Sequence, residues 1–265
     1  MSQSGCTNHI VERMVLMDRF DIGRAFRVPF EDPGWVNKTL MALVWSLLVV
    51  TLPAIYGAQV EYIRGVAKGD ETLPDWDGFG QKWVDGLLVA LAGFVYFLPV
   101  LALGAVLFLP AIIAGVAGGD SGALGALVGG GTCIFVLVSI VYTAAVSVFY
   151  SAAITHFAMR GSFGAFFDLK GIAALVRGKT GYFTAWLYVL LISVGVSAIS
   201  GFLTGATAGF GGILMGAVSY LAAMMSGHVL GQWASVAYAR TAPAPFGAAG
   251  QQSSPPPPPP PPAAY

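Results

Sequence analysis

The segment EYIRGVAKGDETLPDWDGFGQKWVD, residues 61–85, decides how the rest of the chain is organised. Nine of its 25 residues are charged, whereas only 10% of the whole chain is. Residues 39–60 before it and 86–119 after it hold no charged side chain. A bilayer core accepts long apolar helices and few ionised side chains. The pattern therefore predicts a water-facing connector between two membrane segments.

The aromatic side chains of this connector predict where it lies. Trp76, Phe79 and Trp83 follow one another at short spacing. Tryptophan and similar rings gather at the headgroup level of a bilayer. We therefore expect these three residues to hold the connector at the membrane surface.

Composition also favours a membrane protein. The chain is 56% hydrophobic, and its 13 basic and 13 acidic residues cancel. A soluble domain carries about 25% charged residues, so the surface of a soluble fold would be too apolar here.

Zero net charge gives no indication of nucleic-acid binding. Cys6 lies in a polar segment and Cys133 in an apolar one, so no disulfide is expected.

Three parts are predicted along the chain. Residues 1–36 form a polar arm, 37–240 an all-α polytopic transmembrane helix bundle, and 241–265 a disordered proline-rich tail. Eight consecutive prolines favour an extended polyproline II conformation in the tail. The tail is either a ligand for a partner protein or a spacer. The arm is either an amphipathic helix or a partly disordered segment, and helical spacing is present at Ile10, Met14 and Met17.

About five membrane spans are predicted, because each apolar segment reaches the ~20 residues that a crossing needs. Pro53 should kink the first span, and Glu61 near its end should pair with Arg64 one turn later. The second charged connector, 159–181, is expected to be a short interfacial helix capped by Ser162. The spans are residues 37–64, 83–117, 123–158, 182–204 and 210–239.

The orientation of these spans leaves two alternatives. Basic residues favour the cytoplasmic side, which places both charged connectors inside. Five crossings then put the arm outside, although it holds four arginines. A re-entrant hairpin around Pro53 would keep both of its ends inside and remove the conflict.

Two sequence features lead to hypotheses, one about helix–helix contacts and one about transport. Small residues recur at every fourth position, which lets helices approach closely in a membrane. This spacing serves either an oligomer interface or packing within one bundle. His228 is the titratable residue expected deepest in the membrane, either bonded to a neighbouring helix or on a transport path. The small residues are Ser193, Ser197, Gly201, Gly205 and Gly209, with Gly212, Gly216, Gly227 and Gly231 in the last span.

The sequence motifs resemble a known family. The Leu73-Pro74 and Trp76-Asp77 pairs between two apolar segments are its most specific elements. On these residues the chain is similar to the bacterial and archaeal membrane family catalogued as domain of unknown function 4013, over residues 26–240. The resemblance implies a multi-spanning membrane protein and carries over no catalytic, cofactor or metal residue. Further matching residues are Pro29-Phe30, Trp35, Lys38, Leu52-Pro53, Gly57, Tyr62-Ile63-Arg64, Gly69, Phe79, Asp85-Gly86, Tyr96, Leu98-Pro99 and Phe163-Gly164-Ala165-Phe166.

The sequence thus leads to a multi-pass cell-membrane protein without an enzymatic constellation. Ser226 and His228 lie two positions apart on one helix and do not face each other. No catalytic, cofactor-binding or metal-binding residue is predicted. The favoured function is membrane organisation or partner contact, and the alternative is a small transporter or channel. The expected partner is the lipid bilayer, and no nucleic acid is expected. A second copy of the chain is a partner only under the alternative in which the small residues form an oligomer interface.

Overall fold

The computed structural model describes residues 21–116, 121–178, 181–207 and 214–239. Every regular element in these ranges is helical, which confirms the predicted all-α fold. The N-terminal 20 residues, with Ile10, Met14 and Met17, and the proline-rich tail lie outside the described residues. The elements are α2 (Ile22–Glu31), α3 (Trp35–Ser46), the 3-10 helix η1 (Val49–Thr51), α4 (Pro53–Ala67), α5 (Phe79–Val116), α6 (Ser121–Arg160), the 3-10 helix η2 (Phe163–Phe167), α7 (Leu169–Arg177), α8 (Tyr182–Ala206) and α9 (Met215–Ala239).

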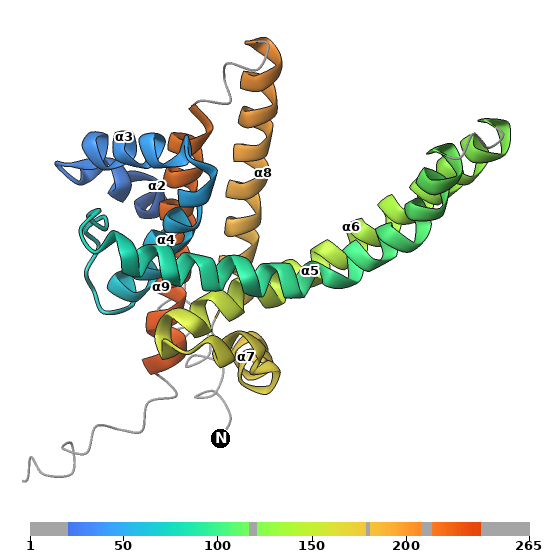
Figure 1. Ribbon diagram of the computed structural model, residues 1–265. Coiled ribbons are helices and arrows are strands. Elements are labelled where there is room, and N and C mark those ends of the chain that lie inside the picture. Colours follow the sequence, from blue (N-terminus) through green and yellow to red (C-terminus); the bar gives the residue numbers. More distant parts are fainter. Residues whose placement is uncertain (1–20, 117–120, 179–180, 208–213, 240–265) are drawn as a thin grey trace, which may run out of the picture.

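Helix α9 is the centre of the packed part of the molecule. It contacts α2, α3, α4, α6 and α8 (Figure 1), and Tyr220, His228 and Trp233 on it are fully buried. Glycine allows these close contacts, since a Cβ atom on Gly231 would lie 2.6 Å from the Cβ of Val66 on α4. The last predicted span is therefore a core helix.

Helices α4 and α5 cross with their backbones in contact. A Cβ atom on Gly57 would collide with the carbonyl oxygen of Lys82, and one on Gly86 would collide with that of Pro53. Only glycine leaves room for a backbone at this distance. The crossing fixes where the first connector leaves α4 and where α5 begins.

Helices α5 and α6 form a long hairpin that extends away from the packed part (Figure 1). They have 38 and 40 residues, or roughly 57 and 60 Å at the α-helical rise. The rings of Phe108 and Phe135 meet edge to face at 5.3 Å between them. Large apolar side chains face outward along the hairpin, including Val106 (72% exposed) and Val116 (86%).

Three helical segments are long and apolar enough to cross a membrane by length and composition. They are Phe79–Val116, Gly129–Arg160 and Tyr182–Ala206, and they coincide with the predicted spans 83–117, 123–158 and 182–204. At the place of the span predicted at 210–239 lies helix α9, from Met215 onward. Within the described residues, α9 is not one of the three helices long and apolar enough to cross. The number of crossings stays a prediction.

The kink predicted at Pro53 within a span of residues 37–64 is wrong. The chain forms two helices there, α3 and α4, and η1 lies between them. Pro53 lies in the first turn of α4, where its missing amide hydrogen costs nothing. It therefore begins a new helix instead of kinking one. Helix α3 has 12 residues, about 18 Å, which is too short for a ~30 Å hydrocarbon core.

The aromatic residues of the first connector pack on protein. The indole nitrogen of Trp76 donates to the carbonyl of Lys38 at 2.9 Å, and that of Trp83 donates to the carbonyl of Val50 at 2.7 Å. The ring of Phe79 lies 4.5 Å from that of Trp45, centroid to centroid. These residues hold the connector against α3 and η1, a role that spacing alone did not distinguish from anchoring in lipid.

Candidate functional site

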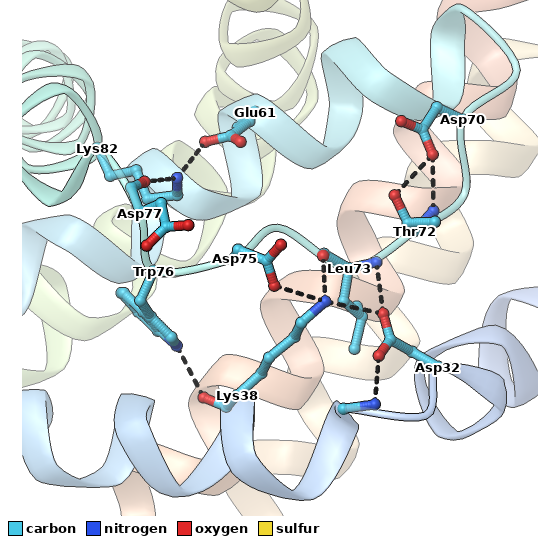
Figure 2. Close-up of polar contacts among 11 residues, drawn as sticks. Asp32, Lys38, Glu61, Asp70, Thr72, Leu73, Asp75, Trp76, Asp77 and Lys82 are labelled. Atoms are coloured by element: carbon cyan, nitrogen blue, oxygen red, sulfur yellow. Dashed lines mark hydrogen bonds and ion pairs between the residues drawn. The ribbon is translucent and has the colours of Figure 1, made fainter.

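A polar cleft lies between α4 and the first connector (Figure 2). Its volume is about 320 Å³. Four carboxylates and one lysine line it, together with backbone and uncharged side chains. The lining residues are Glu61, Tyr62, Gly65, Asp70, Thr72, Leu73, Pro74, Asp75, Asp77 and Lys82.

Lys38 of α3 joins the turn before α3 to the first connector at one side of the cleft. Its Nζ atom lies 2.9 Å from Asp32 Oδ2, 2.7 Å from the Leu73 carbonyl oxygen and 3.0 Å from Asp75 Oδ1 (Figure 2). The three donor hydrogens of the ammonium group are thus matched by three acceptors. This arrangement fixes the connector to the first turn of α3.

Asp32 completes the same junction from the turn before α3. Its carboxylate accepts the backbone amides of Gly34 at 2.7 Å and Leu73 at 3.1 Å. Burial alone would raise the pKa of this carboxyl. The hydrogen bonds from Lys38, Gly34 and Leu73 outweigh burial and hold the pKa below its ordinary value. Asp32 is therefore an ionised acceptor that ties the connector to the arm.

A second lysine closes the other side of the cleft. Lys82 is buried, and its Nζ atom lies 2.7 Å from Glu61 Oε2 and 2.7 Å from the carbonyl oxygen of Asp77. The predicted pairing of Glu61 with Arg64 is therefore wrong. Arg64 instead lies 3.7 Å from Asp85 and donates to the carbonyl of Ala158 at 2.9 Å. The α4–α5 crossing brings Lys82 and Asp85 of α5 to these two side chains of α4.

The outer rim of the cleft is held by short-range bonds and by the arm. Asp70 accepts the amide and the hydroxyl of Thr72, and these bonds lower the pKa of its carboxyl. Glu71 pairs with Arg24 of α2 at 2.6 Å. The N-terminal arm and the first connector are thereby joined directly.

His228 lies inside the packed part, bonded to Tyr62 of the cleft lining. Its Nδ1 atom is 3.2 Å from the Tyr62 hydroxyl on α4, and its Nε2 atom is 2.8 Å from the Gln232 amide nitrogen. The side chain is fully buried. The interpretation of a histidine bonded to a neighbouring helix is confirmed.

A second polar cluster lies where α6 ends. His156 Nδ1 is 2.5 Å from the Tyr238 hydroxyl, and its Nε2 is 3.4 Å from Asp168 Oδ2. Asp168 also lies 3.4 Å from Arg160 and accepts the Gly171 amide at 2.9 Å. The hydrogen bond from the Gly171 amide is the largest cause of the lowered pKa of the Asp168 carboxyl. Asp168, and not the predicted Ser162, caps the connector helix.

The small-residue pattern divides between two roles. Gly216, Gly227 and Gly231 on α9 pack against α3 and α4. On α8 the corresponding positions face outward, and a Cβ atom on Gly201 or Gly205 would meet open space. Packing within the bundle therefore accounts for the α9 glycines and not for the α8 face. Pairing of two copies through α8 stays a prediction, and Gly209 and Gly212 lie outside the described residues.

The basic groups at the cleft are paired within the chain. Its two buried or half-buried ammonium groups are neutralised by carboxylates and bonded to carbonyl oxygens. Among the described residues, no group of three or more His, Cys, Asp or Glu converges as a metal site. Sequence reasoning recognised the charge of this segment, but it missed Lys38 and Asp32 as its partners. The available signals were their nearness in sequence to Trp35 and, for Lys38, its place among the residues that carry the family resemblance.

These findings define an all-α protein with three helices suited to a bilayer, compatible with an integral membrane protein. The chain belongs to the family described as protein of unknown function (DUF4013), whose model matches residues 40–205. The matched range includes the lining of the cleft, the first two long apolar helices and the third up to residue 205. No curated protein and no solved structure matches the chain.

Proposed function

We propose that this chain is a non-enzymatic integral membrane protein that organises contacts at one face of the cell membrane. The observation that supports this proposal most directly is the junction that Lys38 and Asp32 form with Leu73 and Asp75 of the connector. It holds a charged segment rigidly against the helices, while the long helices turn apolar side chains outward. A fixed polar platform on lipid-exposed helices suits partner contact.

The topology that follows from this proposal is a re-entrant α3–α4 segment. The first turn of α3 touches the connector that follows α4, so both ends of the segment lie at one level. Helix α3 is also too short to cross. With α5, α6, α8 and α9 crossing, the arm, both connectors and the tail share the cytoplasmic side, in agreement with the basic residues that they hold.

The alternative of a small transporter or channel would need His228 on a conduction path. In the structure, the two ring nitrogens of His228 are hydrogen-bonded to Tyr62 and Gln232, and the side chain is fully buried in the core. These contacts favour the organising role over transport.

Reconstitution into liposomes tests the choice between the two functions. We expect proton and potassium leakage equal to that of protein-free vesicles, with no change on His228→Ala. Flux that appears with the protein and disappears in the His228→Ala variant would overturn the proposal.

Photocrosslinking in cells tests the contact surface itself. A crosslinker at Asp77, which is exposed at the rim, should yield protein adducts. A matched crosslinker at Val106 on α5 should yield lipid adducts. Lipid adducts alone at both positions would count against a partner-binding platform.

A further inference from the structure

Helix α7 and the residues just before it form a surface with three distinct faces. Ile172 and Leu175 are buried, and α7 packs against α6 and α8. Lys170, Ala174 and Arg177 are exposed. At 100° per residue these three share a stripe roughly opposite the buried one. The helix therefore turns an apolar face to protein and a basic face outward.

Between these two faces lies an exposed apolar flank. Leu169 is 59% exposed and Phe167 is 40% exposed. Ala173 and Val176 follow Leu169 on the same side and are half-buried. An apolar flank beside a basic stripe is the pattern of a helix that lies in the headgroup region of a bilayer.

The chain places this helix at the right depth for that role. Helix α6 ends at Arg160 and α8 begins at Tyr182, and both are apolar enough to cross a membrane. The short segment between them must stay at the membrane surface where α6 leaves and α8 enters. This position makes the occupant of the exposed face a lipid headgroup.

The charge of the segment indicates which headgroups it suits. Residues 160–178 hold three basic side chains and one acidic, a net charge of +2, whereas the first connector holds three basic and six acidic ones. Asp168 is occupied by the Gly171 amide and by Arg160 and His156. Within the described part of the chain, Lys170 and Arg177 form no ion pair.

We propose that the basic stripe of α7, Lys170 and Arg177, with the adjacent Arg160, is a docking surface for anionic phospholipid headgroups. This inference rests on the membrane residence in the proposed function. The exposed flank of Phe167 and Leu169 lies among the acyl chains near the headgroups. The first connector, which is acidic and packed on α3, has no such affinity.

The test measures which lipid adjoins α7 in the full chain. In a Cys6→Ser/Cys133→Ser background, Ala174→Cys carries a bimane fluorophore, and the protein is reconstituted in phosphatidylcholine vesicles. Quenching by nitroxide-labelled phosphatidylglycerol is compared with quenching by nitroxide-labelled phosphatidylcholine. A second bimane reporter, at Val106→Cys on α5, shows independently whether the long apolar helix lies in the membrane.

We expect phosphatidylglycerol to quench the reporter at 174 in preference to phosphatidylcholine. Each exposed basic residue near an anionic membrane surface strengthens binding to that surface about fivefold. The Lys170→Gln/Arg177→Gln variant removes two such residues and should therefore reduce the preference by about 25-fold. The matched control Arg27→Gln/Lys68→Gln, which removes two exposed bases elsewhere, should leave the preference unchanged.

Several outcomes would overturn the inference. Equal quenching by both lipids, an equal loss in the control variant, or abolition of the preference by inorganic phosphate would each exclude a specific lipid surface. No quenching at 174 with strong quenching at 106 would show that α7 lies away from lipid, and would leave membrane residence intact. No quenching at either position would reject the proposed membrane residence as well.

Discussion

The Nη2 atom of Arg24 lies 2.6 Å from the Oε2 atom of Glu71. This pair joins α2, which precedes the first apolar helix, to the connector that follows α4. Together with the contact between Lys38 and Leu73, it places the arm, the start of α3 and the first connector on one face. We infer that residues 35–67 enter and leave the membrane on the same side.

The crossing of α4 and α5 should be intolerant of a single methyl group. A Cβ atom on Gly86 would collide with the Pro53 carbonyl oxygen, so Gly86→Ala should cost about 1–3 kcal/mol of stability through overpacking. Gly80→Ala on the same helix meets open space and should be neutral or slightly stabilising. Thermal unfolding in detergent compares the two, and equal melting temperatures would contradict the close crossing.

Trp76 should contribute to folding through protein contacts. Its ring packs on Tyr220 at 5.7 Å between centroids, and its indole N–H bonds to the Lys38 carbonyl. Trp76→Ala should lower the folded yield in detergent and cost about 2–3 kcal/mol, below a fully buried tryptophan because the ring is half-exposed. Trp76→Phe should recover most of the loss. Unchanged yield in the alanine variant would mean that the motif has another role.

The junction at Asp32 predicts a specific acid sensitivity. The folded-state pKa of this carboxyl lies below its ordinary value of 3.8. Its stabilisation is therefore complete above that ordinary value and is lost as the pH falls through the lower folded pKa. Asp32→Asn should lower the melting temperature at neutral pH. On acidification, the melting temperature of this variant should then fall less than that of the unmodified protein. The control Glu31→Gln, an exposed neighbour, should follow the unmodified protein, and an acid profile unaffected by Asp32→Asn would refute the assignment.

The two glycine-containing faces should respond differently to substitution. Gly231→Ala on α9 meets Val66 and should destabilise the fold by about 1–3 kcal/mol. Gly201→Ala on α8 meets nothing within the chain and should leave the melting temperature unchanged. If two copies pair through α8, the bulkier Gly201→Leu should lower crosslinked dimer in membranes without unfolding the monomer. Destabilisation of the monomer by Gly201→Ala would contradict the outward orientation of this face.

Composition and apolar length were sufficient to predict the helical class and the three long apolar segments, because both depend on local sequence. The break between α3 and α4 entered the sequence analysis only through the alternative of a re-entrant hairpin around Pro53, since Pro53 is equally compatible with a kink and with a first turn. The partners of Glu61 and Arg64 were also missed. They depend on the α4–α5 crossing, which is set by Gly57 and Gly86 and does not follow from spacing within one helix.

The location of both connectors and the arm on one membrane face is tested most directly by cysteine accessibility. Single substitutions Arg27→Cys, Asp70→Cys, Asp168→Cys and Asp120→Cys are made in the cysteine-free background, and intact cells are treated with a membrane-impermeant maleimide. We predict that only the Asp120 position, in the turn expected on the far side, is labelled before lysis. Labelling of the Arg27 position in intact cells, with the Asp70 position protected, would contradict the account.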